Sequence, residues 1–336
     1  MEKLKKKIKQ TLFIFFKCIV AGIVALAILS GVCFLVNYSG ARVHNESGAT
    51  DFKWGENQYR ATALEGFSWF FMDNHGFNNI ENYSKNPEIL IMGSSHMEGA
   101  NVNPEKTTAS LLLKGTSYSV YNIATSGHTI YNCVNNMDNA VKEYSPSKYL
   151  IVETVSAELS VAEMQKVIDG KFKPFESYDS GVLYALQKYI PAVKAMYKQI
   201  GFWRDADKTL SENPSTQLEE ENYEEVLEAF LLKAKNSADK SGAQLIIFYH
   251  PEIKIDEKAN AYTEVSDRNK LLAFENVCNK LGILYVDMTD TFTELYNNDH
   301  ILPYGFYNTG VGSAHLNEHG HKAIAEEIYN LISEDK

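Results

Sequence analysis

A serine in this chain stands where α/β proteins mount a nucleophile. The apolar run 88–92 is followed by Gly93, and Ser95 comes two residues later, ahead of a predicted helix. Glycine permits the tight turn, the hydroxyl then projects above the sheet, and backbone N–H groups beyond the turn can face a developing oxyanion. The alternative is that Ser95 is a turn serine that caps the next helix, and the pattern alone does not choose between the two roles.

A histidine far along the chain favours the nucleophile. His315 lies in the loop before the amphipathic stretch 319–332, where its imidazole could take the proton of a serine hydroxyl. Motifs of other chemistries are not met. Met97 stands where G-x-S-x-G needs its second glycine, no phosphate loop follows the first strand, and 310–312 lacks the third glycine of a dinucleotide site. The sequence therefore implies no cofactor.

The elements that would position these residues alternate between strand and helix. Short apolar runs, typical of strands buried on both faces, occur at 88–92, 118–123, 149–153, 244–249 and 283–287. Helices are predicted at 104–113, 131–144, 223–240, 267–280 and 319–332. This alternation predicts an α/β fold, a three-layer α/β/α sandwich around a five-stranded parallel sheet. Ligands of such sheets bind at the carboxyl ends of the strands, which is where Ser95 would lie.

The remaining segments suggest a domain organisation. Residues 1–10 are a basic tail, 11–38 a membrane anchor, 39–86 a lead-in segment, and 87–336 the α/β domain. The lead-in is rich in aromatic residues at 67–71 and is expected to pack on the domain. The stretch 159–222 is too long for a crossover, so we interpret it as a helical insertion.

The N-terminus predicts a single-pass anchor. Residues 18–36 are 19 consecutive positions without a charge or an amide side chain, close to the roughly 20 that span a bilayer as a helix. Six lysines precede this stretch, five of them within residues 1–10, so the positive-inside rule places the N-terminus in the cytoplasm and the domain outside the cell membrane. No small-x-small cleavage site follows, and Cys33 comes one residue too late for a lipoprotein signal, which favours an uncleaved anchor.

Composition limits the partners. The net charge is −11, and the residues after position 37 hold 26 basic and 42 acidic groups, so nucleic acid is not an expected partner. Cys133 and Cys278 could form a disulfide in an oxidising compartment. Two buried small hydrophobic residues are the simpler interpretation.

The two motifs together resemble the SGNH, or GDSL-type, hydrolase superfamily over about residues 88–332. The resemblance implies a flavodoxin-like fold in which Ser95 is the nucleophile of the first block and His315 the base of the last. It further implies that Gly127, after the second strand, donates an N–H to the oxyanion hole together with Ser95. The chain looks like the branch that acts on acyl esters of cell-envelope polymers, which includes the proteins of teichoic acid D-alanylation and alginate O-acetylation.

The acid of the superfamily's Asp-x-x-His block is missing, because that position is Gly312. A base needs a group on Nδ1 that fixes its tautomer and orientation. A backbone carbonyl, Asn308, or a carboxylate such as Asp287 could orient His315, and the sequence leaves these open.

The asparagine of the third block is missing as well. Thr154-Val155-Ser156 stands where it is expected, just beyond Glu153. Such an asparagine is an oxyanion donor, and losing one donor raises the barrier by a few kcal/mol. A hydroxyl of Thr154 or Ser156 is the candidate replacement.

Other histidines near the predicted site allow two interpretations each. His96 and His250 are candidate substrate contacts, or else His96 fills the turn and His250 has a structural role at the end of its strand. His315 and His319 are four residues apart and could share a helical face, but Gly320 interrupts it and H-E-x-x-H is absent. We therefore expect no metal site.

These patterns predict an extracytoplasmic, membrane-anchored serine acyl-ester hydrolase, and the resemblance implies that it acts on O-acyl groups, above all O-acetyl groups, of cell-envelope glycans. One alternative is an O-acyltransferase of surface polysaccharide that works with a multi-spanning membrane partner exporting the acyl group. The other is a non-catalytic member that binds polysaccharide, an alternative supported by the missing acid and amide.

Overall fold

The computed structural model describes residues 2–38, 40–83, 85–173, 190, 192, 222–263 and 267–334. Most of the insertion predicted at 159–222 lies outside the described residues. The chain divides into two compact units, one with residues 1–39 and 179–212 and the other with 40–178 and 213–336. Each unit is described by itself.

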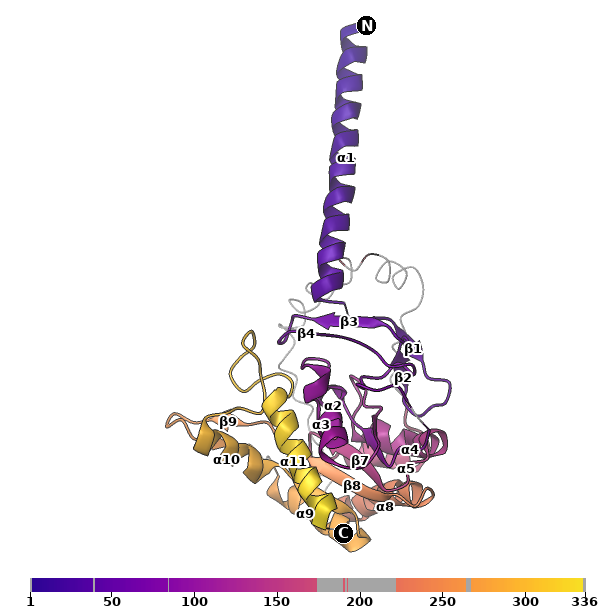
Figure 1. Ribbon diagram of the computed structural model, residues 1–336, viewed down its shortest axis with the longest axis vertical. Helices are drawn as coiled ribbons and strands as arrows, with labels where there is room; N and C mark the ends of the chain where they lie inside the picture. The colour runs from indigo at the N-terminus through magenta and orange to yellow at the C-terminus, as the bar shows by residue number, and fades with distance from the viewer. Residues whose placement is uncertain are drawn as a thin grey trace. The chain divides into compact units, whose positions relative to one another are not determined.

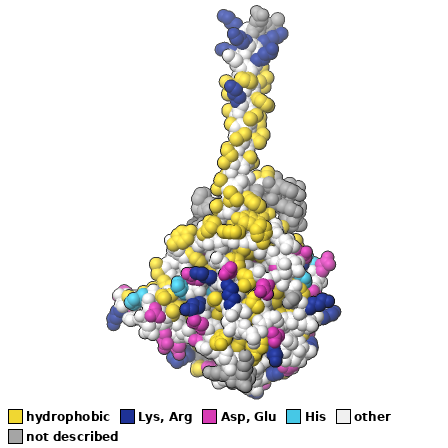
Figure 2. Space-filling model, viewed as in Figure 1, with side chains coloured by type: hydrophobic (Ala, Val, Ile, Leu, Met, Phe, Trp, Pro, Cys, Tyr) yellow, Lys and Arg dark blue, Asp and Glu magenta, His cyan; other side chains and the backbone are white. Residues whose placement is uncertain are grey.

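Helix α1, Glu2–Val36, belongs to the first unit. Its apolar side chains are exposed along most of its length, and lysines gather toward its N-terminal end (Figure 2). The segment Lys3–Val36 is long and apolar enough to be a candidate membrane span. The helix includes the residues predicted as a basic tail, because lysine is a good helix former.

The second unit is built on a five-stranded parallel sheet in the order β11-β8-β7-β5-β6 (Figure 1). Its strands are β5 (Ile89–Met92), β6 (Val120–Asn122), β7 (Tyr149–Thr154), β8 (Gln244–Tyr249) and β11 (Leu284–Asp287). All five predicted strands are present, so the predicted fold class is confirmed. The first strand in the sheet, β5, lies between the second and the third, and this switch in strand order is where α/β sheets bind ligands.

Helices cover both faces of the sheet and bury one apolar layer each. On one face lie α4 (Ile130–Tyr144), α5 (Val161–Ile168), α8 (Tyr223–Asp239) and α9 (Arg268–Leu281). The other face packs against α3 (Thr108–Gly115), α10 (Thr289–Asp299) and α11 (Glu318–Glu334), with a 3₁₀ turn at Pro104–Lys106 before α3. Alternate strand residues enter the two layers, as the pleat requires. Cys133 and Cys278 are both free and buried in the first layer.

The lead-in segment contains regular secondary structure. It forms two antiparallel pairs, β1 (Arg42–His44) with β2 (Phe52–Trp54), and β3 (Tyr59–Thr62) with β4 (Ser68–Phe71). Another small pair, β9 (Lys254–Ile255) with β10 (Ala261–Tyr262), follows β8. The lead-in is fixed to the sandwich where Trp54 Nε1 donates to Glu98 Oε1 at 2.8 Å and the Ser68 hydroxyl donates to the carbonyl of Ala100.

Candidate active site

The turn after β5 presents Ser95 at the start of a helix. A Cβ on Gly93 would lie 2.4 Å from Glu153 Oε2, so only glycine fits at this position. Ser94 then caps helix α2 (Ser95–Glu98) by accepting a hydrogen bond from His96 N at 3.1 Å. Ser95 is therefore the first helical residue, half-buried, with its hydroxyl at the carboxyl edge of the sheet.

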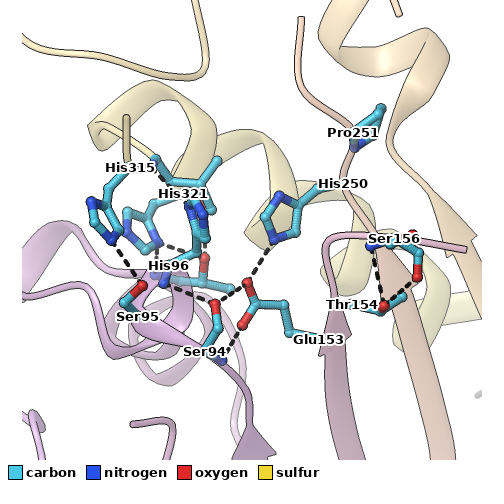
Figure 3. Close-up of polar contacts among 12 residues, drawn as sticks. Ser94, Ser95, His96, Glu153, Thr154, Ser156, His250, Pro251, His315 and His321 are labelled. Atoms are coloured by element: carbon cyan, nitrogen blue, oxygen red, sulfur yellow. Dashed lines mark hydrogen bonds and ion pairs between the residues drawn. The ribbon is translucent and has the colours of Figure 1, made fainter. Parts of the chain in front are cut away.

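Ser95 and His315 meet, although 220 positions separate them in the chain. Ser95 Oγ lies 2.8 Å from His315 Nε2. Figure 3 marks this contact between the two labelled side chains with a dashed line. On the other side of the same ring, His315 Nδ1 lies 2.5 Å from Glu65 Oε2. The side chains of His315 and Glu65 are 29% and 32% exposed, so the cluster is accessible from solvent. Hydroxyl, imidazole and carboxylate thus form one chain of contacts, the arrangement that activates serine nucleophiles.

Glu65, which sequence reasoning missed, comes from the loop that joins β3 and β4. Asn308 holds this loop by accepting a hydrogen bond from Gly66 N at 2.7 Å and donating one to the Ala63 carbonyl at 2.9 Å. Gly66 adopts φ +66°, and a Cβ there would lie 2.5 Å from the Phe306 ring. No pattern around Glu65 signals its role, because its partner is 250 positions away.

Both residues predicted to orient His315 have other contacts. Asn308 holds the Glu65 loop instead of the imidazole. Asp287, at the end of β11, accepts a hydrogen bond from Thr289 N at 2.8 Å in the turn that leads into α10. Each prediction was wrong for the same reason: a carboxylate from a distant loop already occupies Nδ1.

Charge and burial set the pKa of the imidazole. Burial lowers the pKa of His315, but the hydrogen bond and negative charge of Glu65 outweigh it and raise that pKa above the usual 6.5. The hydrogen bond from His315 holds the pKa of Glu65 below its usual value, with burial acting in the opposite direction. Glu65 is therefore ionised at neutral pH, and it stabilises the imidazolium that forms when Ser95 is deprotonated.

Two backbone N–H groups were predicted as oxyanion donors, those of Ser95 and Gly127. The N–H of Ser95 points out of the first turn of α2, where the helix dipole favours negative charge. Gly127 lies in an exposed turn with φ +89°, and this turn is fixed to the end of β5 by the hydrogen bond from Thr125 N to the Gly93 carbonyl at 3.0 Å. Within the described ranges, neither N–H donates to a protein group. Both N–H groups are therefore free to donate to another group.

A buried carboxylate joins the segments that carry the site. Glu98, in α2, is 1% exposed and accepts hydrogen bonds from Arg60 of β3 and from Ser126, with the Ser126 N–H at 2.7 Å. Burial raises the pKa of Glu98, but Arg60 and Ser126 reverse the shift and leave that pKa lowered, so the group stays charged. Glu98 therefore connects the Ser95 helix to the hairpin of Glu65 and to the turn of Gly127.

The hydroxyls of Thr154 and Ser156 are not free to replace the missing oxyanion donor. Thr154 Oγ1 donates to the Ser156 carbonyl at 2.5 Å, and Ser156 Oγ donates to the Glu158 carbonyl at 3.4 Å. A hydroxyl has one proton, and each of these protons closes a local turn. The tentative prediction for Thr154 was therefore wrong.

Glu153, one residue earlier, organises a second polar cluster. Its carboxylate accepts from Ser94 N at 2.5 Å and from Ser94 Oγ at 2.9 Å, and it lies 2.7 Å from His250 Nε2. His250 Nδ1 in turn lies 2.6 Å from the hydroxyl of Tyr304. His250 is only 1% exposed, so a substrate does not reach it and its predicted role as a substrate contact was wrong.

His96 packs between the two clusters. Its ring centroid lies 4.9 Å from that of His315 and 5.1 Å from that of His250, and its Nδ1 accepts a hydrogen bond from Leu316 N at 3.2 Å. Burial, reinforced by the charge of His250, lowers the pKa of His96 to about 3. His96 is therefore a neutral ring that supports His315, and its predicted contact with substrate stays a prediction.

The two remaining histidines of the C-terminal block, His319 and His321, differ in burial. His321 is buried, with Nδ1 3.0 Å from Thr108 Oγ1, and burial lowers its pKa to about 3. The side chain of His319 is 48% exposed. These two side chains and His315 therefore have different surroundings and do not converge as ligands.

A cleft of about 860 Å³ lies next to the Glu65 and His315 loops. Ser95 and His315 are not among its lining residues. The cleft is bordered by the neighbours of the site, Gly66 and Phe67 on one side and Gly305 and Tyr304 on the other. It is large enough to hold a sugar or a similarly sized group.

No family model and no curated protein matches the sequence. Solved structures with similar folds include an acetyl xylan esterase, at 15% identity and a TM-score of 0.39 over 73% of this chain and 99% of the other. A member of the lipolytic protein G-D-S-L family from Veillonella parvula DSM 2008 has 15% identity and a TM-score of 0.36 over 73% and 97% of the two chains. The salicylyl-acyltransferase SsfX3 from a tetracycline biosynthetic pathway has 11% identity and a TM-score of 0.33 over 73% and 55%. We base the chemistry of the site on its geometry alone.

Proposed function

We propose that this protein is a membrane-anchored serine acyl-ester hydrolase that works through Ser95, His315 and Glu65. The observation that carries this proposal is the unbroken chain of contacts, 2.8 Å from Ser95 Oγ to His315 Nε2 and 2.5 Å from Nδ1 to Glu65. A non-catalytic role was suggested by the missing acid of the C-terminal block. The missing amide of the third block was the other reason. Glu65 supplies the acid from another part of the chain, which removes the first of these two reasons.

In the first half of the reaction, Ser95 Oγ attacks the carbonyl carbon of an ester while its proton passes to His315 Nε2. The carbonyl oxygen becomes an oxyanion, which accepts hydrogen bonds from the N–H groups of Ser95 and Gly127. Glu65 keeps the proton on Nδ1, so that Nε2 is the free base. The tetrahedral intermediate then collapses, the C–O bond to the leaving alcohol breaks, and His315 gives that alcohol its proton.

In the second half, water attacks the acyl-enzyme on Ser95. His315 takes a proton from this water, a second tetrahedral intermediate forms, and its collapse returns the proton to Ser95 Oγ and releases the carboxylic acid. The same residues serve both halves, so the nature of the incoming nucleophile decides between hydrolysis and transfer.

The expected substrates are O-acyl groups, above all O-acetyl groups, on glycans of the cell envelope. The candidate span α1 supports a place at the membrane, with the N-terminus in the cytoplasm and the second unit outside. The excess of acidic residues after position 37 supports a neutral or weakly charged polymer over nucleic acid.

Transfer to a sugar hydroxyl is the second candidate function. The observation that favours it is the cleft bordered by Gly66 and Gly305, which offers space for an acceptor next to the loops that carry Glu65 and His315. An acyltransferase of this kind would work with a multi-spanning membrane partner that exports the acyl group. Hydrolysis needs no such partner.

The proposal is tested with the full chain in lipid nanodiscs. Incubation with a fluorophosphonate, followed by peptide mass spectrometry, is expected to place one adduct on Ser95. The adjacent Ser94 is a matched control within the same peptide, because its hydroxyl donates to Glu153 and has no imidazole partner among the described residues. An adduct on Ser94, or none on either serine, would contradict the proposed nucleophile.

The choice between hydrolysis and transfer follows from the products. A chromogenic acetyl ester is offered with and without an excess of oligosaccharide. Free acetate alone in both samples supports the hydrolase, whereas acetylated oligosaccharide at the expense of acetate supports the transferase.

A further inference from the structure

The hairpin β3–β4 leaves an apolar face uncovered. Along β4, Ser68 and Phe70 are buried, whereas Trp69 and Phe71 are 59% and 60% exposed. The flanking loop adds Phe67, also more than half exposed. Figure 2 shows hydrophobic side chains gathered over the hairpin that Figure 1 labels β3 and β4. Contiguous apolar surfaces of this kind on a folded domain mark sites of interaction.

The chain itself indicates what covers this face. Helix α1 ends at Val36 and β1 begins at Arg42, six residues later. An extended chain advances about 3.3–3.6 Å per residue, so the start of β1 stays within about 20 Å of the end of the helix. If α1 spans a bilayer, the second unit is therefore held against that bilayer's surface, whatever its orientation.

The connection reaches the second unit next to the apolar face. Ala41 N donates to Gln58 Oε1 at 3.1 Å, and Gly55 N donates to the Ala41 carbonyl at 3.0 Å. Gln58 directly precedes β3, whose first residue Tyr59 pairs with Phe71 of β4. The rings of this pair lie 5.6 Å apart. The short connection thus reaches the end of the hairpin that holds Phe71, and the loop with Leu64 and Phe67 lies at the other end.

We propose that the outer face of the β3–β4 hairpin, formed by Leu64, Phe67, Trp69 and Phe71, docks on the lipid–water interface of the membrane that holds α1. Aromatic side chains favour this interface, tryptophan above all, because an apolar ring can enter the acyl region while its N–H stays near the headgroups. The inference rests on the anchoring proposed above and goes beyond it, since an anchored domain need not touch the lipid.

Docking would place the site at the membrane surface. Glu65 lies within the docking loop, between Leu64 and Phe67, and Phe67 also lines the cleft beside the site. The cleft therefore opens at the edge of the docked face. Substrates bound to lipid or assembled at the membrane surface would reach Ser95 without leaving the interface.

The test uses the full chain in vesicles of phosphatidylcholine and phosphatidylglycerol, with lipids brominated on their acyl chains as quenchers. The fluorescence of Trp69 is the difference between the signal of the unaltered chain and that of Trp69→Phe. This subtraction cancels the signals of Trp54 and Trp203. Docking predicts that brominated lipid quenches Trp69 and that aqueous iodide does not. A Trp69 that iodide quenches and brominated lipid does not would overturn the proposal.

A matched pair of variants sharpens the result. Phe71→Glu places a charge on the proposed face, and Leu272→Glu places one at an exposed apolar position of α9, where Leu272 is 47% exposed. Phe71→Glu is expected to weaken quenching by lipid at least about twofold, and Leu272→Glu to leave it unchanged. Equal loss in both variants would contradict a specific face.

Two further readouts separate this inference from the proposals on which it rests. Flotation of the chain with vesicles after alkaline carbonate washing reports the anchor, and fluorophosphonate labelling reports Ser95. An exposed Trp69 in a chain that floats and is labelled overturns docking alone. A chain that does not float overturns both the anchor and docking. The vesicles contain no protein other than this chain. A face that is covered by a protein partner would therefore give an iodide-accessible Trp69, and this result would count against the proposal.

Discussion

Two Ser–His–Glu clusters lie side by side at the edge of the sheet, and only one is arranged for catalysis. In the first, the imidazole of His315 stands between Ser95 and Glu65. In the second, the carboxylate of Glu153 stands between Ser94 and His250. The same three residue types, mounted on neighbouring serines, therefore occur in two different orders.

The order of contacts decides what each cluster can do. An imidazole in the middle can accept the serine proton at Nε2 while the carboxylate stabilises its charge from the other side. With the carboxylate in the middle, Ser94 donates to Glu153, and its hydroxyl also caps α2 by accepting from His96 N. The proton and an acceptor site of the Ser94 hydroxyl are therefore both occupied by hydrogen bonds within the protein.

Exposure separates the clusters as well. The side chains of Glu65 and His315 are about one-third exposed, whereas those of Glu153 and His250 are 1% and 0% exposed. A substrate can reach the first cluster and not the second. The buried cluster is instead the support that holds the Ser94–Ser95 turn in place.

The largest effect is expected from the two serines. Ser95→Ala should lower kcat on a chromogenic acetyl ester by about 10⁴-fold, because the nucleophile is lost. Ser94→Ala should lower it by less than about tenfold and reduce stability by about 1 kcal/mol through the lost helix cap. Steady-state kinetics and thermal unfolding measure the two quantities. An equal loss of kcat in both variants would contradict the conclusion that only the cluster with Ser95 is arranged for catalysis.

Glu65→Gln should have the next largest effect, lowering kcat by about 10²-fold or more, because the amide no longer fixes the Nδ1–H tautomer. The pH profile provides a second readout. Activity requires neutral His315, so it rises with pH through the pKa of that residue, which Glu65 raises. Removing the negative charge lowers this pKa, so the rising limb of kcat/KM should move to lower pH. A limb that stays in place would show that Glu65 does not act on His315.

Glu153→Gln is expected to affect stability more than activity. Breaking the buried contact with His250 should reduce the free energy of unfolding by about 3 kcal/mol, since the substitution leaves the buried His250 without its charged partner. The kcat should fall by less than about tenfold. A loss of kcat as large as that of Glu65→Gln would show that Glu153 takes part in catalysis.

The same residue predicts an acid-labile contribution to stability. Burial raises the pKa of Glu153, but its contacts with His250 outweigh burial and lower that pKa from the usual 4.5 to about 2. A lowered folded-state pKa stabilises the protein above pH 4.5, and this stabilisation is lost as the pH falls from 4.5 toward 2. Thermal unfolding across this range should show a shallower pH dependence for Glu153→Gln than for the unaltered chain.

Thr154→Val should have the smallest effect. The hydroxyl of Thr154 closes a turn through the Ser156 carbonyl. Its removal is expected to reduce stability by about 1 kcal/mol and to leave kcat within about twofold. A loss of kcat comparable to that of an oxyanion donor, about 10²-fold, would restore Thr154 to the oxyanion hole.

The sequence by itself determined the sheet and the position of its first serine. The five strands have continuous apolar runs because both faces of a parallel sheet are buried, and this pattern is local enough to identify. Ser95 after β5 and His315 before α11 were predictable because parallel strands and their loops meet at one sheet edge. The predicted bounds differ from the observed ones by a residue or two at most ends.

Only the tertiary structure decided which carboxylate serves His315 and which histidine serves a structural role. Glu65 comes from the loop of a hairpin outside the sheet, and its contact depends on the fixation of that loop by Asn308 and of the hairpin by Glu98. His250 follows the apolar strand β8 and His315 lies in the loop before α11, and the local sequence does not encode which of the two is buried. Pairing between distant side chains depends on how whole elements pack, and the chain carries no periodic signal for such packing.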